Sequence, residues 1–279
     1  MGVLDGKAVI VTGAGRGLGR AFALDAAQQG ASVVVNDIDA DGAEKVAAEI
    51  AESGGQALAS AGSVADWDCA GELVARCLKE YGAVDGLVNN AGVLSLTPPW
   101  AETEDSLRRV VEVNLLGALF VGTHAVRAMI DQGSGSIVNI TSSAQLGLAT
   151  MGAYGATKGA LASLTYSWSI DLRGYFVRVN AYAPVAATAM TDMSPVVPPD
   201  LPEPADNAGI VTYLLSDLSD EISGQVIQRR GNRLVVLAHP CLTEHGADAD
   251  TWTVDAVVDG FDPVLREHRE AVGYAIKRS

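Results

Sequence analysis

Short runs of apolar and β-branched residues alternate along most of the chain with longer segments in which apolar residues recur at helical spacing. The short runs predict β-strands over residues 7–12, 32–36, 56–64, 84–88, 136–140, 176–183 and 224–227. The longer segments predict helices over residues 18–30, 40–53, 66–81, 102–130, 153–173 and 207–218. Strands that alternate with helices form a parallel sheet with helices on both faces. The pattern therefore predicts the α/β class and a doubly wound parallel sheet.

The end of the chain follows a different pattern. An extra strand is predicted over residues 234–237, and short helices are predicted over residues 251–258 and 263–274. We therefore expect one domain, residues 1–233, followed by a C-terminal extension over residues 234–279.

The extension is too apolar to remain disordered. Its large apolar side chains are Leu234, Val235, Val236, Leu237, Trp252, Val254, Val257, Val258, Phe261, Leu265, Val272 and Tyr274. Full burial of each large side chain contributes roughly 1.5 to 3 kcal/mol, which favours docking on a continuous surface. We expect the extension to pack either on its own domain or across a subunit interface, where it would help to roof a substrate cleft.

Composition limits the classes of partner. The chain has 279 residues, of which 48% are hydrophobic, and this suits one large or two small globular domains. Acidic residues outnumber basic ones by 34 to 19, so the formal net charge is -15. This charge opposes phosphate groups, and we expect no binding to nucleic acid or to an anionic membrane surface.

The compartment is predicted from apolar runs and cysteines. The run over residues 115–122 is far shorter than the roughly 18 residues of a membrane span, and no export signal is visible at the N-terminus. Cys69 and Cys77 share a predicted helix, where a separation of about 12 Å prevents a disulfide. Because Cys241 leaves the set odd, we expect a reducing, cytoplasmic setting.

A glycine-rich turn follows the first predicted strand and fits the pattern T-G-x-x-x-G-x-G. Its candidate cofactor-binding residues are Gly13, Gly15, Arg16, Gly17, Leu18 and Gly19, directly after Thr12. Glycines let backbone N–H groups approach a pyrophosphate, which then lies at the positive end of the following helix. The turn therefore predicts a dinucleotide site.

Asp37 follows the second predicted strand, where a carboxylate can accept hydrogen bonds from both hydroxyls of an adenosine ribose. Asp39 is the nearby alternative. A carboxylate at this place would face the extra phosphate of NADP, and the like charges cost several kcal/mol. We therefore expect NAD as the cofactor, although Arg16 is placed to reach that phosphate.

Beyond these features the chain resembles the short-chain dehydrogenase/reductase family over roughly residues 4–228. The motifs that carry the resemblance are the glycine turn, Asn89-Asn90-Ala91-Gly92, Asn114, Ser142 and Tyr154-x-x-x-Lys158. The resemblance implies a Rossmann-type sheet of about seven strands, NAD(P)-dependent interconversion of an alcohol and a ketone, and an Asn-Ser-Tyr-Lys tetrad. It also implies a homotetramer or homodimer built partly on the helices over residues 102–130 and 153–173.

The predicted catalytic pair lies on one helix face. Tyr154 and Lys158 are four residues apart, so the ammonium can stabilise the phenolate. Tyr154 is therefore expected to act as general base in alcohol oxidation and as general acid in the reverse reaction. The resemblance adds that Lys158 bonds the nicotinamide ribose and that Asn114 connects Lys158 to solvent through water.

Ser142 is the predicted donor to the substrate oxygen, because it follows the fifth strand. The interval from Ser142 to Tyr154 is one residue shorter than the commonest spacing in the family. Thr141 and Ser143 therefore remain alternatives for this role.

The family pattern suggests further cofactor contacts, with two departures. Candidates are Asn90, Ala91 and Gly92 after the fourth strand, Pro184, Val185 and Thr188 after the sixth, and Ser63 and Val64 after the third. Val185 stands where the family usually has Gly, and it still offers a backbone N–H to the cofactor. Ser63 stands where it often has Asp, which leaves the Val64 backbone as the expected contact to the adenine amine.

A metal site is not expected. His239, Cys241 and His245 are three soft ligands within seven residues, yet no second matched pair completes a zinc site.

We expect an NAD-dependent oxidoreductase that acts on an apolar secondary alcohol or ketone. Apolar residues flank the predicted catalytic tyrosine, namely Leu94, Leu96, Leu146, Leu148 and Met151, although each of them could equally fill the core. Similarity to the hydroxyacyl-CoA dehydrogenase module of multifunctional β-oxidation enzymes suggests 3-hydroxyacyl thioesters as substrates, and steroids or terpenoid alcohols are the alternatives. The alternative is a catalytically silent nucleotide-binding regulatory protein, against which an intact tetrad argues.

Overall fold

The computed structural model describes residues 2–188 and 200–268. The chain divides into two compact units, Met1–Leu237 and Ala238–Ser279.

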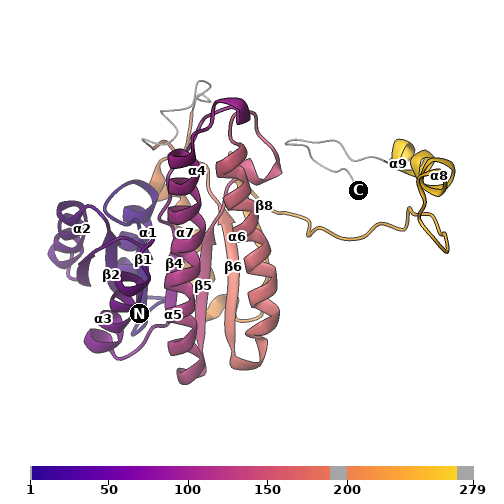
Figure 1. Cartoon of the computed structure of the whole chain (residues 1–279). Helices are drawn as coiled ribbons and strands as arrows, with labels where there is room; N and C mark the ends of the chain where they lie inside the picture. The colour runs from indigo at the N-terminus through magenta and orange to yellow at the C-terminus, as the bar shows by residue number, and fades with distance from the viewer. Residues whose placement is uncertain (1, 189–199, 269–279) are drawn as a thin grey trace. The chain divides into compact units, whose positions relative to one another are not determined.

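The first unit is built on one eight-stranded sheet, with strand order β3-β2-β1-β4-β5-β6-β7-β8 (Figure 1). Its strands are β1 (Ala8–Thr12), β2 (Ser32–Asp37), β3 (Gln56–Ala61), β4 (Gly86–Asn89), β5 (Gly135–Ile140), β6 (Val177–Ala183), β7 (Val226–Arg230) and β8 (Arg233–Val236). Pairing is parallel from β3 through β7, and β8 turns back antiparallel on β7. The doubly wound sheet is therefore confirmed, and the predicted extra strand is β8, the eighth.

The central strands are apolar on both faces because helices cover both. Along β1, Val9 and Val11 pack in one hydrophobic cluster, whereas Ile10 between them packs in the other. Successive side chains of a strand point to opposite faces, so a continuous apolar run is what a strand between two helix layers needs.

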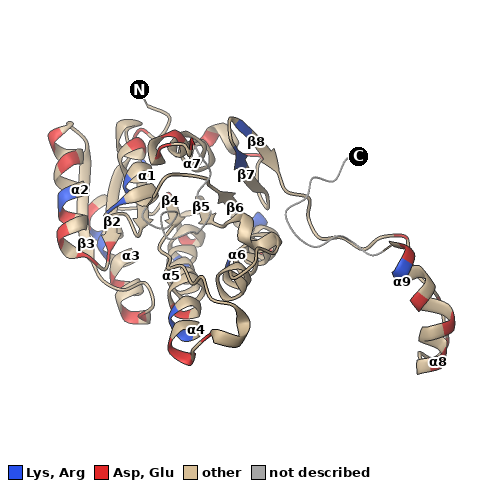
Figure 2. Ribbon diagram, turned by 90° about the horizontal axis from the view of Figure 1, so that it is seen from above, with Lys and Arg blue, Asp and Glu red and all other residues tan. Residues whose placement is uncertain are grey.

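One face of the sheet carries α1 (Gly17–Gln28), α2 (Ala40–Glu52) and α7 (Ala208–Leu215). Phe22 and Leu214, both fully buried, lie in the cluster beneath this layer. The outer side of α2 carries several of the acidic residues that give the chain its negative charge (Figure 2).

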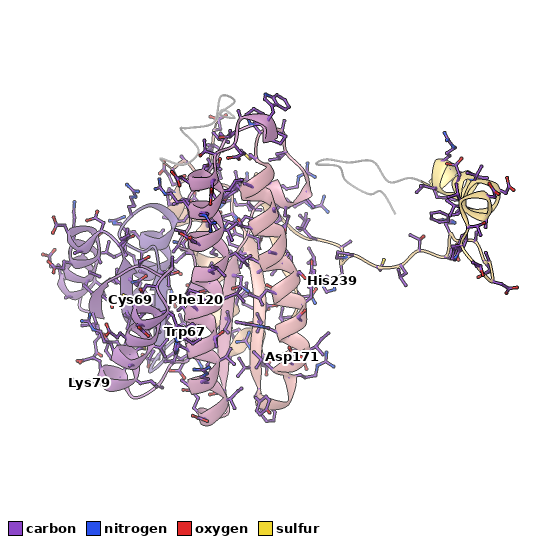
Figure 3. All side chains as sticks on the ribbon, viewed as in Figure 1. Trp67, Cys69, Lys79, Phe120, Asp171 and His239 are labelled. Atoms are coloured by element: carbon purple, nitrogen blue, oxygen red, sulfur yellow. The ribbon has the colours of Figure 1, made fainter. Side chains whose placement is uncertain are left out.

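The opposite face carries α3 (Trp67–Tyr81), α5 (Gly117–Gln132) and α6 (Gly152–Asp171). Trp67 at the start of α3 packs edge-on against Phe120 of α5, with 5.3 Å between the ring centroids (Figure 3). Buried Met129 of α5 lies in the same layer.

The long helix predicted over residues 102–130 consists of three segments. They are α4 (Glu104–Val111), a π-helical turn (Glu112–Leu116) and α5. The whole stretch Glu104–Gln132 is long and apolar enough, by length and composition alone, to cross a membrane. In this structure its apolar side chains cover the sheet, with Val121 and Ala125 fully buried.

The second unit contains a helical stretch made of α8 (Val254–Ala256), a π-helical turn (Val257–Phe261) and α9 (Asp262–His268). Trp252 lies edge-on to Phe261, with 6.1 Å between the centroids, and His245 stacks on His268 at 3.7 Å. The last part of the helix predicted over residues 263–274 lies outside the described residues.

Parallel pairing brings the carboxyl ends of β1, β4, β5 and β6 to the same edge of the sheet. Ligands of open α/β sheets bind at this edge. The segments that follow these strands carry most of the predicted cofactor-binding residues.

Candidate active site

The glycine-rich turn joins β1 to α1 and holds its backbone in a tight path. Gly13 has a φ of +61°, and a Cβ atom there would lie 2.7 Å from the Cα of Ala91. A Cβ at Gly19 would lie 2.1 Å from the carbonyl oxygen of Gly13. Only glycine fits at these two positions, which lets the first turn of α1 pack directly against the end of β1.

The N-terminus of α1 is suited to an anion. Arg16 is its N-cap residue and makes no side-chain capping hydrogen bond, so the side chain leaves the first amide groups of a 12-residue helix uncapped. Such amides and the helix dipole bind phosphate. Gly17 has a φ of +56°, and the atom nearest to a Cβ placed there is the Thr188 side-chain methyl at 3.8 Å. Thr188 therefore lies beside the glycine turn.

Asp37 lies at the end of β2 and is anchored to the glycine turn. Its Oδ2 accepts a hydrogen bond from the Gly15 amide at 2.9 Å, and its Oδ1 accepts one from the Asp39 amide at 3.0 Å. Asp39 instead caps α2 by accepting from the Gly42 amide at 3.3 Å. Of the two carboxylates, Asp37 is thus the one held against the glycine turn.

The turn after β4 is hydrogen-bonded to β1 and to the glycine turn through the side chains of Thr12 and Asn90. Thr12 Oγ1 accepts hydrogen bonds from the amides of Asn90 at 3.0 Å and Ala91 at 3.1 Å. The Asn90 side-chain amide donates to the carbonyls of Thr12 and Gly13 at 2.8 and 3.0 Å. The Asn90 side chain therefore holds the glycine turn in place. The Thr12 hydroxyl helps to hold the turn after β4, although in the sequence Thr12 marks only the start of the glycine motif.

The remaining cofactor candidates also lie in loops after strands. After β3, the Ser63 hydroxyl accepts a hydrogen bond from the Ala65 amide at 3.2 Å. The neighbouring Val64 packs closely on Gly117, where a Cβ atom would collide with the Val64 side chain. After β6, the Val185 carbonyl accepts from Asn207 Nδ2 at 3.1 Å, while Pro184 is half-buried.

Tyr154 and Lys158 lie in the first turns of α6, and both side chains are buried. The Lys158 ammonium donates to the Ile140 carbonyl at 2.7 Å and lies 5.7 Å from the centroid of the Tyr154 ring. Burial lowers the pKa of Lys158 to about 8. Burial raises the pKa of Tyr154, and the hydrogen bond with the Ser142 side chain opposes this rise.

Ser142 follows β5, and its side chain is hydrogen-bonded to the Tyr154 side chain. Its Oγ also accepts from the Ala144 amide at 3.2 Å, which starts the 3-10 turn Ser143–Leu146. That turn packs directly on α6, because a Cβ at Gly155 would lie 2.6 Å from the Ala144 carbonyl oxygen. This close packing brings Ser142 to the phenol, whereas Ser143 begins the turn.

Asn114 is fully buried in the π-helical turn between α4 and α5. Its Oδ1 accepts from the Val93 amide at 2.7 Å, and its Nδ2 donates to the Val93 carbonyl at 2.9 Å and to Thr157 Oγ1 at 3.2 Å. Asn114 thus joins the turn after β4 to α6, and Thr157 is a residue of the site that no motif indicated.

A metal site has no support in the part of the chain that the structure describes. Within residues 2–188 and 200–268, no group of three or more His, Cys, Asp or Glu side chains could hold a metal ion.

The sequence is similar to a known protein family and to named enzymes. The family described as short chain dehydrogenase matches residues 7–200. L-rhamnose 1-dehydrogenase (NAD(P)(+)) of Azotobacter vinelandii is 37% identical over 256 residues, which cover 84% of this chain and 99% of that protein.

Two solved structures extend the comparison. A short chain dehydrogenase from Mycobacterium avium has a TM-score of 0.84 at 34% identity and covers 95% of each chain. That alignment therefore reaches past Leu237 into the second unit. NAD⁺-bound xylitol dehydrogenase has a TM-score of 0.75 at 29% identity and covers 81% of this chain and 98% of that one.

Proposed function

The chain belongs to the short-chain dehydrogenase/reductase family of NAD(P)-dependent oxidoreductases, and on that premise we propose that it interconverts an apolar secondary alcohol and the matching ketone with NAD. The substrates that we propose are 3-hydroxyacyl thioesters, steroids or terpenoid-like alcohols.

One observation carries the apolar substrate class. Five large apolar side chains in the segments after β4 and β5 are partly exposed, and in the described structure none of them belongs to a hydrophobic core cluster. They are Leu94, Leu96, Leu146, Leu148 and Met151. Apolar side chains that do not fill the core at the carboxyl edge of the sheet are suited to line a pocket for an apolar ligand.

The residues fit a dinucleotide. The α1 N-terminus and the glycine turn would hold the pyrophosphate, and Asp37, already oriented by Gly15, would accept hydrogen bonds from the adenosine ribose. The Asp37 charge supports NAD over NADP, because the 2′-phosphate of NADP would lie against it. When bound, the nicotinamide supplies hydride transfer.

The proton step belongs to Tyr154. In alcohol oxidation the Tyr154 oxygen takes the proton of the substrate hydroxyl, and in ketone reduction it returns that proton. Ser142 is hydrogen-bonded to Tyr154 in this structure and would turn its one hydroxyl hydrogen to the substrate oxygen, holding that oxygen against the phenol. Lys158, 5.7 Å from the ring, favours the phenolate by its positive charge and offsets the effect of burial.

A substrate panel tests the proposal. It contains a 3-hydroxyacyl thioester, a hydroxysteroid, a terpenoid alcohol, L-rhamnose and xylitol, each with NAD and with NADP, followed by reduced-nicotinamide absorbance. We expect the highest kcat/KM for one of the three apolar substrates with NAD. A preference for rhamnose or xylitol would contradict the apolar class, and NAD binding without any turnover would favour a regulatory role.

Two further expectations accompany this proposal. We propose a cytoplasmic location, supported by three free cysteines of which Cys77 is buried and Cys241 exposed. We also propose a homotetramer or homodimer, which the mass of the protein in solution tests.

A further inference from the structure

Thr157 lies on α6 between Tyr154 and Lys158 and is buried. Its hydroxyl donates to the Tyr154 carbonyl oxygen at 2.8 Å and accepts from Asn114 Nδ2 at 3.2 Å. One hydroxyl therefore connects the backbone of the predicted general base to the side chain of Asn114.

Both Nδ2 hydrogens of the Asn114 side-chain amide are engaged in hydrogen bonds. One Nδ2 hydrogen points to the Val93 carbonyl and the other to Thr157, while Oδ1 accepts from the Val93 amide. The bond to Thr157 is the one that reaches α6. Without it, Asn114 would be tied only to the turn after β4.

The same space contains the Lys158 ammonium. A Cβ atom placed on Gly92 would lie 3.3 Å from Asn114 Oδ1 and 3.7 Å from Lys158 Nζ. Asn114, Lys158 and the turn after β4 thus converge on one buried point. A shift of α6 against Asn114 would change the position of Lys158 relative to that turn.

We propose that Thr157 is a positioning residue, whose hydroxyl fixes the α6 turn carrying Tyr154 and Lys158 against Asn114. This inference rests on the proposed function, because it concerns the same catalytic pair. In this role Thr157 acts through Tyr154 and Lys158.

The hydroxyl, rather than the volume of the side chain, carries the effect. Valine has nearly the shape of threonine but cannot accept the Asn114 hydrogen, so a buried N–H loses its partner. Serine keeps the oxygen and loses only a methyl group. Thr157→Val and Thr157→Ser therefore separate hydrogen bonding from packing.

The same helix offers a matched control. Thr165 is also fully buried, its Oγ1 donates to the Leu161 carbonyl at 2.8 Å, and it accepts from Asn139 Nδ2 at 3.0 Å. Thr165→Val removes an equivalent pair of hydrogen bonds two turns farther along α6. A general loss of helix packing would affect both threonines alike.

Steady-state kinetics with the best substrate of the panel form the first test. Thr157→Val should lower kcat roughly 10- to 100-fold, the range expected for misplaced catalytic groups, with little change in the KM for NAD. Thr157→Ser should restore most of kcat, and Thr165→Val should stay within about threefold of the parent. Equal effects of the two valine variants, or no rescue by serine, would overturn the proposal.

A second test needs no substrate. The ultraviolet titration of tyrosinate, taken as the difference between each protein and its Tyr154→Phe partner, reports the pKa of Tyr154 alone. A displaced α6 turn should weaken the Ser142–Tyr154 hydrogen bond, which lowers the pKa of Tyr154, so that pKa should move upward in Thr157→Val and not in Thr165→Val. An unchanged titration in Thr157→Val would reject the positioning role, whereas failure of every substrate in the panel would reject only the proposed function.

Discussion

The side chain of Ser142 at the end of β5 is hydrogen-bonded to the side chain of Tyr154 at the start of α6. The two residues are 12 positions apart, and the 3-10 turn between them packs against Gly155. The hydrogen bond lowers the pKa of Tyr154 while burial raises it. The substrate oxygen would complete this pair by accepting from Ser142 and exchanging its proton with Tyr154.

The first prediction separates two adjacent serines. Ser142→Ala should reduce kcat at least 100-fold, because the orienting donor is lost, as seen when one oxyanion donor is removed. Ser143→Ala should retain near-normal kcat and serves as the control. If Ser143→Ala were inactive and Ser142→Ala active, the substrate contact would belong to Ser143 and the proposed role of Ser142 would be wrong.

The second prediction concerns stability and pH. Burial lowers the pKa of Lys158 from 10.5 to about 8, so the unfolded chain holds this proton more tightly than the folded one. Folding is therefore penalised below about pH 8, and the penalty fades as pH rises towards 10.5. At 1.4 kcal/mol per pH unit this penalty is on the order of 3 kcal/mol, partly offset by about 1 kcal/mol from the hydrogen bond to Ile140.

Lys158→Met removes both effects and should unfold at higher urea concentration than the parent at about pH 7, although it should be inactive. Its advantage should shrink as pH rises between about 8 and 10. An advantage that stays constant over that range would show that the charge of Lys158 is not the cause.

The third prediction tests cofactor choice with two neighbouring carboxylates. The parent should prefer NAD to NADP by at least about 100-fold in kcat/KM, since like-charge contact costs several kcal/mol. Asp37→Asn should narrow the ratio while keeping an acceptor for the Gly15 amide. Asp39→Asn changes the cap of α2 and should leave the ratio unchanged. A parent with equal efficiency on both cofactors would contradict the proposal.

The fourth prediction concerns the C-terminal unit. Exposed apolar side chains remain on it, including Trp252, Val254, Val258 and Leu265. Truncation after Leu237 keeps β8 in its sheet and removes only this unit. If the unit packs across a subunit interface and roofs a substrate cleft, truncation should lower the assembly state and weaken substrate binding, with the Kd for NAD unchanged.

Mass in solution and kinetics distinguish the alternatives for this unit. If the number of subunits stays the same and only the KM for substrate rises, the unit docks on its own subunit. Unchanged kinetics and an unchanged number of subunits would reject both forms of docking.

Much of the fold follows from the sequence because its strands are buried on both faces. The continuous apolar runs of β1 and β2, which contain Ile10 and Val34, fit only between two apolar layers, and both residues are fully buried there. The π-helical turn Glu112–Leu116 could not be predicted, because no local pattern of residues marks it. At its centre Asn114 bonds to Val93, a contact that exists only after β4 and α5 have come together.

The site was predictable as far as its residues occupy strand ends. Asp37 could be placed from its position after β2, since every carboxyl end of a parallel sheet lies at one edge. The use of Asn90 to bond the Thr12 carbonyl and the role of Thr157 required three-dimensional contacts. Thr157 reads in the sequence as an ordinary buried residue of a helix.

The most direct test of Tyr154 as the proton-transfer residue is the turnover and NAD affinity of Tyr154→Phe, measured with the same preparation. The variant loses only the oxygen that exchanges the substrate proton, so we expect loss of detectable turnover with a Kd for NAD within about twofold of the parent. Calorimetric titration of NAD and reduced-nicotinamide absorbance give the two values. Turnover of Tyr154→Phe close to that of the parent, with NAD still bound, would contradict the assignment of Tyr154 as general acid and base.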